Sequence, residues 1–203
     1  RWHGVDRLQY AVTPRFAPTS TAEQLAAAGR LLAEHKGVYL HTHLAENIDE
    51  IKWVKTLFPE AKDYLDVYDQ AGLLGKRSVF AHGIHLCDRE CERLATSDSA
   101  IAHCPTSNLF IGSGLFPMAR LQNHGIKIGM GTDVGGGTSF NMLQTLADSY
   151  KMQQLQGHNL SPEQSFYLAT LGGATALDLD DKIGNFAIGK EADFLLLDPN
   201  ATD

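Results

Sequence analysis

The residues best suited to chemistry in this chain are histidines and carboxylates at the ends of apolar segments. His41 and His43 are two positions apart, so strand alternation would place both on one face. Glu46 follows His43 by three positions, where the strand gives way to a loop. A histidine ligand followed closely by a carboxylate suits a hydrolytic metal site, because a metal-bound water needs a carboxylate within hydrogen-bond reach to move protons. An ordinary polar strand end explains the same stretch, and the stretch alone does not decide between them.

Two more candidates end later apolar segments. His82 ends the segment at 79–82, and Asp133 directly follows the segment at 127–132. Taken singly, each has a structural explanation, since a strand-end histidine is often structural and Asp favours turns and caps. Together with His43 and Glu46 they form a set that chance rarely arranges. Imidazoles and carboxylates around an open position suit a catalytic zinc, or iron.

The cysteines and the other histidines do not extend this set. Cys87, Cys91 and Cys104 lack the paired spacing of a zinc knuckle, and Cys104 precedes a proline, the reverse of the cytidine-deaminase order. We expect all three to be packing residues. We also expect His103, in the middle of an apolar segment, to lie in the core. An odd number of cysteines without framework spacing indicates a reducing compartment, and hence the cytoplasm.

The elements that must position these residues alternate regularly. Short apolar segments predict five buried strands, at 10–13, 38–43, 79–82, 100–104 and 127–132. Amphipathic segments predict helices between them: one that opens with a capping box at 20–23, one that begins at Ser161, and others at 47–57, 89–96, 117–123 and 141–156. Such alternation is typical of a parallel sheet with crossover helices. A doubly wound sheet is the alternative, but its glycine-rich phosphate turn is absent. The candidates instead follow successive strands, as the active site of a (β/α)8 barrel requires.

Length bounds this prediction. The chain has 203 residues, fewer than the roughly 250 of a complete barrel. We therefore expect an α/β fold that is a partial (β/α)8 barrel over residues 1–182. From residue 183 the pattern changes to turns and short strands, which predicts the beginning of a small β-sandwich domain over 183–203. Because the sequence begins with Arg1, we expect it to be the C-terminal portion of a longer protein.

Charge and hydropathy exclude two classes of partner. The formal net charge is −7, and Lys and Arg form no basic run. This argues against binding of nucleic acid or of an anionic membrane surface. No stretch approaches the roughly 20 apolar residues that cross a bilayer. Small neutral substrates remain open.

At these residues the chain resembles the amidohydrolase superfamily of metal-dependent hydrolases, from about residue 8 to residue 199. The superfamily marks are His43 with Glu46, His82 before a glycine, and Asp133 after Gly-Thr. Narrower marks resemble the guanine deaminases within that superfamily. They are Thr-Pro-Arg-Phe at 13–16, His-Leu-Ala-Glu-Asn at 43–47, Cys-Pro-Thr-Ser-Asn-Leu at 104–109 and Thr-Leu-Gly-Gly-Ala at 170–174. The pair Arg15-Phe16 in this setting points to guanine.

The resemblance implies hydrolytic deamination of guanine to xanthine and ammonia by a zinc-dependent, or iron-dependent, homodimeric enzyme. It implies that His43 and Asp133 bind the metal and that Glu46 carries a proton from the metal-bound water to the purine ring. His82 would hold that water or the tetrahedral intermediate, and Asp133 would accept a proton. The residues implied in substrate binding are Arg15, Phe16, His43, Leu44, Ala45, Glu46 and Asp133.

One departure from the superfamily pattern limits what this chain can do alone. The first barrel strand of the superfamily carries a metal-binding His-x-His pair, and nothing upstream of Arg15 contains it. His41 and His43 have the same spacing, but their neighbourhood matches a later strand. We therefore expect the isolated chain to bind zinc poorly and to be inactive.

Two other interpretations stay open. The chain can belong to another amidohydrolase, which acts on cytosine, an adenosine-type compound or a triazine. It can also be a non-catalytic partial barrel that serves as an assembly unit, with its sheet edge covered by a partner.

Overall fold

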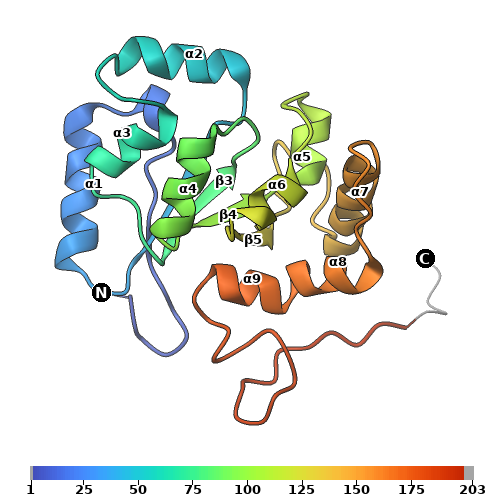
Figure 1. Cartoon of the computed structure of the whole chain (residues 1–203). Helices are drawn as coiled ribbons and strands as arrows, with labels where there is room; N and C mark the ends of the chain where they lie inside the picture. Colours follow the sequence, from blue (N-terminus) through green and yellow to red (C-terminus); the bar gives the residue numbers. More distant parts are fainter. Residues whose placement is uncertain (1, 199–203) are drawn as a thin grey trace.

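Five parallel strands form the centre of the computed structural model, which describes residues 2–198 (Figure 1). They are β1 (Ala11–Val12), β2 (Tyr39–Leu44), β3 (Ser78–His82), β4 (Ala100–His103) and β5 (Lys127–Met130). All five predicted strands are confirmed, with ends within two residues of the prediction. The connecting helices are η1 (Ala17–Thr19), α1 (Ala22–Glu34), α2 (Ile48–Leu57), α3 (Tyr64–Gln70), α4 (Asp88–Thr96), α5 (Pro105–Phe110), α6 (Met118–Asn123), α7 (Met142–Gln154), α8 (Pro162–Ala169) and α9 (Leu171–Ala176).

The order of the strands identifies the type of α/β fold. They lie in the sheet in the order β1-β2-β3-β4-β5, and every neighbouring pair is parallel. A doubly wound sheet reverses its strand order at a switch point, whereas a (β/α)8 barrel keeps the sequential order. The sheet is therefore a partial (β/α)8 barrel, as predicted, and the doubly wound alternative is wrong.

The two faces of the sheet differ in burial. Right-handed crossovers between sequential parallel strands place the connecting helices on one face. On β2, Leu40, Thr42 and Leu44 are buried, whereas His41 is exposed and His43 is half-buried. Leu40 and Leu44 join the apolar core together with residues of the helices. The opposite face thus carries the alternating histidines, and it is the face that lines the interior of a barrel.

Local hydrogen bonds explain where the helices begin. α2 starts with a capping box formed by Asn47 and Glu50, and α8 starts with one formed by Ser161 and Gln164. The capping box predicted at 20–23 is wrong. Ser20, just after η1, donates its hydroxyl to the carbonyl of Phe16, just before η1, and the cap of α1 is the next residue, Thr21.

Three short α-helices were not predicted. α3 is buried at Tyr64–Tyr68, so it lacks the polar face that marks an amphipathic helix. α5 begins at a proline, which fits the first turn of a helix but was interpreted as a turn. α9 follows α8 directly, and both pack against β5 (Figure 1).

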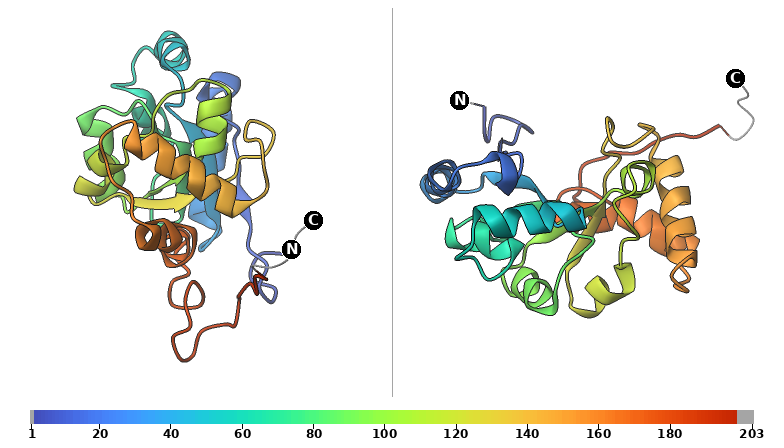
Figure 2. Two further views of the ribbon diagram at one scale, coloured as in Figure 1. Left: turned by 90° about the vertical axis from the view of Figure 1, so that its right-hand side faces the viewer. Right: turned by 90° about the horizontal axis from the view of Figure 1, so that it is seen from above.

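The segment after α9 forms turns and an irregular run through residue 198 (Figure 2). Residues 183–198 contain no strand, and residues 199–203 lie outside the described part of the chain. The small β domain predicted for 183–203 therefore stays a prediction. Arg7 forms ion pairs with Glu191 and Asp193, so this segment lies beside the beginning of the chain.

One buried hydroxyl group joins β2 to the segment before α1. Tyr68 on α3 is fully buried, and burial raises the pKa of its hydroxyl to about 12. The protonated hydroxyl donates to the carbonyl of His43 at 2.8 Å and accepts from the backbone N–H of Ala17 at 2.9 Å. Two backbone groups that would otherwise be buried without partners are thereby paired.

Substitution of Tyr68 by phenylalanine tests this role. Tyr68→Phe is expected to lower the free energy of unfolding by about 1–3 kcal/mol, because it leaves a buried N–H and a buried carbonyl unpaired. Urea unfolding followed by circular dichroism measures the change. Tyr150→Phe, at a half-exposed position on α7, is the matched control and is expected to change little. Equal effects of the two substitutions would contradict this role for the Tyr68 hydroxyl.

Candidate metal and active site

The ends of β2 and β3 and the loop after β5 bring four predicted site residues together. Leu44 pairs with His82 in the register of β2 and β3, so the residues that follow both strands leave the sheet at one edge. His82 is almost fully buried, and its Nε2 lies 3.5 Å from Glu46 Oε2 and 3.9 Å from Asp133 Oδ2. The ring of His43 stacks on that of His82, with the centroids 5.4 Å apart. The predicted imidazoles and carboxylates are therefore neighbours in space.

Three residues at or after these strand ends have left-handed backbone conformations. Ala45, His82 and Asp133 have φ angles of 47°, 72° and 49°. Such values are uncommon for residues other than glycine and persist only where the surroundings hold them. Here the backbone N–H of Gly83 donates to the carbonyl of Leu44, and two further N–H groups of the same turn donate to the carbonyl of Ala45. The turns after β2 and β3 thus support each other.

His43 has the hydrogen bond expected of a metal-binding histidine. Its Nδ1 donates to the backbone carbonyl of Arg15 at 2.6 Å, since a carbonyl oxygen only accepts. The other nitrogen, Nε2, therefore keeps a free lone pair. Metal-binding histidines usually donate their second ring N–H in this way. The same carbonyl also accepts from Thr42 Oγ1 and from the backbone N–H of His43, so it anchors Arg15 on β2.

Two of the residues predicted to hold the base, Arg15 and Phe16, lie beside His43. The guanidinium carbon of Arg15 is 4.8 Å from the ring centroid of Phe16, and the Phe16 ring meets the His43 ring edge-on at 6.0 Å. Arg15 is exposed and Phe16 is half-buried. Leu44 and Ala45 are fully buried members of the apolar core. Their contact with a substrate stays a prediction.

Asp133 lies in a tight glycine loop after β5. A Cβ atom on Gly137 would lie 1.9 Å from the carbonyl oxygen of Thr132, so only glycine fits there. The Thr106 hydroxyl on α5 donates to the same carbonyl at 3.2 Å. The loop is therefore fixed both by its own close packing and by α5.

Two other contacts at the site come from residues to which the sequence assigned no individual role. Asn108 on α5 is fully buried, and its Oδ1 is 2.9 Å from His82 Nδ1. Ser113, just beyond α5, donates its hydroxyl to Glu46 Oε1 at 2.8 Å. Asn108 falls within the motif at 104–109, but nothing in the sequence indicates its partner. No motif or spacing in the sequence indicates a role for Ser113.

The donor set at this edge fits a metal ion. One ligand atom each of His82, Cys104 and Asp133 lie within 4.8 Å of one another. Imidazole, thiol and carboxylate donors are the usual ligands of zinc. Of the two predicted metal ligands, Asp133 belongs to this group of three residues. The other, His43, lies next to the group because its ring stacks on that of His82. Cys104, expected as a packing residue, is 3% exposed. Burial, together with the charges of Asp133 and Glu46, raises the pKa of its thiol well above the usual range.

His103 is a core residue, as predicted. It is fully buried, its ring stacks on Phe116 at 4.2 Å, and its Nε2 hydrogen-bonds with Ser149. Burial lowers the pKa of His103 to about 3, and the neighbouring His82 contributes to the shift.

This shift predicts acid sensitivity. The unfolded chain binds a proton at His103 below about pH 6.5, whereas the folded chain does so only near pH 3. The stability that the neutral residue contributes is therefore present above pH 6.5 and is lost as the pH falls towards 3, by about 1.4 kcal/mol per unit. Relative to His103→Gln, which does not titrate, the native chain should lose roughly 2–3 kcal/mol between pH 7.5 and pH 4.5. Urea unfolding at the two pH values measures the difference, and a pH-independent difference would contradict the prediction.

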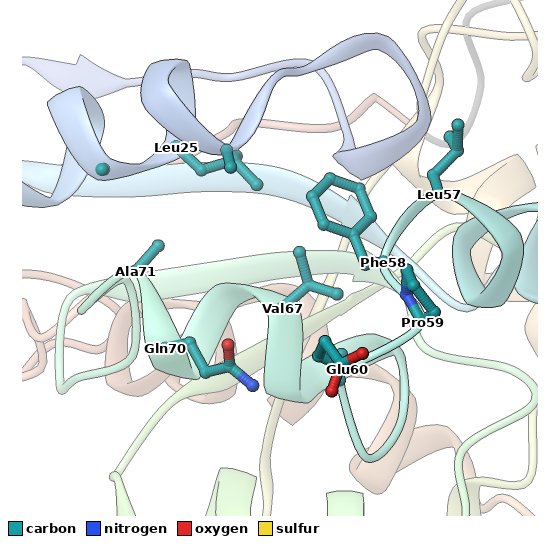
Figure 3. A pocket seen from close by; sticks show the side chains of 11 residues that line it. Leu25, Leu57, Phe58, Pro59, Glu60, Val67, Gln70 and Ala71 are labelled. Carbon is teal, nitrogen blue, oxygen red and sulfur yellow. The ribbon is translucent and has the colours of Figure 1, made fainter.

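A cavity of about 370 Å³ lies elsewhere, between α1, α3 and the chain after α2 (Figure 3). Leu25, Phe58 and Val67 are among its largely apolar lining residues. None of the predicted site residues lines it.

Comparison with known proteins identifies the class. The model of the Amidohydrolase family matches residues 3–203, and the chain belongs to that family. The guanine deaminase of Escherichia coli is 59% identical over 202 residues, which are all of this chain and 46% of that relative. This chain thus spans about half the length of the curated relatives it matches.

Solved structures agree. A structure of E. coli guanine deaminase superposes with a TM-score of 0.97 at 59% identity, over 99% of this chain and 47% of that one. Guanine deaminase from C. acetobutylicum with bound guanine has a TM-score of 0.80 at 33% identity, over 87% and 43% of the two chains. An adenosine deaminase from Xanthomonas campestris with bound zinc has a TM-score of 0.86 at 26% identity, over 95% and 44%. The resemblance to guanine deaminases found in the motifs is confirmed.

Proposed function

We propose that this chain, within a full-length protein, supplies a large part of the active site of a zinc-dependent guanine deaminase, which hydrolyses guanine to xanthine and ammonia. The observation that carries the proposal is the convergence of Glu46 and Asp133 on Nε2 of His82. The 59% identity to the E. coli guanine deaminase supports the choice of substrate.

In this proposal His43 and Asp133 hold the zinc, which supplies a nucleophilic water near neutral pH when it is bound. The free Nε2 of His43 and the carboxylate of Asp133 are suitable donors. His82 and Cys104 border the same position, since their ligand atoms lie within 4.8 Å of Asp133.

The carboxylates move the protons of the reaction. Glu46 carries one proton of the attacking water to the purine ring. Asp133 accepts the second proton of that water, which then passes to the amino group with the help of Glu46, so that the group leaves as ammonia. Ser113 occupies Glu46 Oε1, so Oε2 is the oxygen left for this transfer. Nε2 of His82 faces both carboxylates and would hold the water or the tetrahedral intermediate between them.

Arg15 and Phe16 would bind the base. The guanidinium donates hydrogen bonds only, so it suits the acceptors on guanine. The Phe16 ring beside His43 offers an aromatic surface for the purine. From the family resemblance, Leu44 and Ala45, which follow His43 directly in the sequence, are also proposed to contact the base.

Two wider features belong to the proposal. A cytoplasmic location is supported by the three cysteines, which form no disulfide within residues 2–198. A homodimer is proposed from the family resemblance. Among the described residues, no helix is both long and apolar enough to span a bilayer.

The activity can be tested in a chimera in which this chain replaces the matching 46% of the E. coli relative. The chimera is expected to release ammonia from guanine, and Glu46→Gln is expected to lower kcat by roughly 10²–10⁴-fold because proton transfer is lost. The matched control is Glu60→Gln, the same change at an exposed residue beside the outer cavity, which should leave kcat unchanged. A folded, zinc-loaded chimera that acts only on another heterocycle would contradict guanine as the substrate. A chimera without zinc or activity would favour an assembly unit.

Zinc binding gives a separate prediction. The isolated 203-residue chain is expected to bind zinc weakly, because it lacks the His-x-His pair of the superfamily, whereas the chimera should retain one zinc through gel filtration. Asp133→Asn should weaken zinc binding by the chimera. The loss should exceed roughly 10–100-fold, which is the usual cost of removing a residue that only hydrogen-bonds to a metal ligand. Metal analysis after gel filtration measures both. Tight stoichiometric zinc in the isolated chain would overturn the first expectation.

A further inference from the structure

One short segment, residues 105–113, contacts both of the side chains proposed to handle protons. Asn108 bonds to His82 and Ser113 bonds to Glu46. The two are tied to each other, because the backbone N–H of Ser113 donates to the carbonyl of Asn108 at 2.9 Å. The carbonyl of Ser113 in turn bonds to Nε2 of His85 at 2.8 Å. α5 and the turn after it therefore act as one unit against the site.

The chemistry of the Asn108 contact selects one form of His82. With the amide of Asn108 oriented as in the structure, its oxygen faces Nδ1 and only accepts hydrogen bonds, so Nδ1 carries a hydrogen, while the buried amide nitrogen has no hydrogen-bond partner among the described residues. In the neutral ring the other nitrogen, Nε2, is then an acceptor. Nε2 is the atom that faces Glu46 and Asp133. The opposite tautomer would place an N–H there and remove the lone pair.

The Ser113 contact selects one oxygen of Glu46. The hydroxyl donates to Oε1, while Oε2 points towards His82 Nε2 at 3.5 Å. Ser113 is 6% exposed, and Glu46 retains 18% exposure of its side chain. Holding Oε1 removes the freedom of the carboxylate to rotate and leaves Oε2 at the site.

We propose that Asn108 and Ser113 are positioning residues: Asn108 fixes the Nδ1-protonated tautomer of His82, and Ser113 orients Glu46 so that Oε2 transfers the proton. The tautomer of His82 and the orientation of Glu46 are properties of this chain alone. Their effect on catalysis rests on the proposed function.

The tautomer is tested without activity. In the metal-free 203-residue chain with ¹⁵N-labelled histidine rings, the His82 signals, identified by their loss in His82→Gln, should show a protonated Nδ1 and an unprotonated Nε2. Asn108→Asp, whose oxygen still accepts, should keep this pattern. Asn108→Leu should give a mixture of tautomers, and Leu109→Ala, an exposed position on α5, is the control. A neutral ring with a protonated Nε2 and an unprotonated Nδ1 in the native chain overturns the proposal. An unchanged pattern of His82 signals in a folded Asn108→Leu variant also overturns it. If that variant does not fold, the spectra of the native chain and of Asn108→Asp decide.

The kinetic consequence is measured in the chimera. Asn108→Leu and Ser113→Ala should each lower kcat by roughly 10–100-fold, which is the usual effect of losing a residue that hydrogen-bonds to a functional side chain. The KM for guanine should change little. Asn108→Asp and Ser113→Thr, which restore the oxygen, should recover part of the loss. If the active chimera keeps its kcat in both deletion variants, the inference fails and the proposed function stands. If the chimera is inactive towards guanine, the proposed function fails and the ring spectra still decide the tautomer.

Discussion

Parallel pairing in sequential order is the constraint on which the rest of the structure depends. It sends the carboxyl ends of neighbouring strands to one edge of the sheet, so residues far apart in the sequence meet there. The pairing of Leu44 with His82 fixes the levels of β2 and β3, and Asp133 reaches the same place through β5. A slip of one residue in that register would turn the histidines towards the apolar core.

Within that frame, short backbone contacts set the direction of each functional group. The strand ends adopt left-handed conformations at Ala45, His82 and Asp133, which cost energy and are held by neighbouring turns. Both site histidines use Nδ1 to bond an oxygen, from Arg15 in one case and from Asn108 in the other. His82 therefore presents Nε2 to the position where the carboxylates converge, and the ring of His43 stacks on it. A site that needs imidazole lone pairs on one side is built by placing oxygen acceptors on the other.

The sequence predicted the strands and four of the site residues, because burial and strand ends leave local patterns. The apolar segments mark the strands. His43 and His82 lie at the ends of β2 and β3, and Glu46 and Asp133 lie in the loops after β2 and β5. α3 and α5 left no such pattern, since one is buried along most of its length and the other is a single short helix. Asn108 and Ser113 could not be assigned, because their roles consist of contacts with residues 26 and 67 positions away. The misplaced cap at Ser20 has a similar cause: its hydroxyl bonds back to Phe16.

The segment at residues 15–17, proposed to bind the base, is hydrogen-bonded to β2, which carries the proposed metal ligand His43. Arg15 accepts three hydrogen bonds from β2 at its carbonyl, including the one from the ring of His43. Two residues later, the N–H of Ala17 bonds to the Tyr68 hydroxyl, which donates to the carbonyl of His43. His43 is thus held to this segment through both its ring and its backbone. The carbonyl of Arg15 thus links the segment proposed to bind the base to the ring of the proposed metal ligand His43.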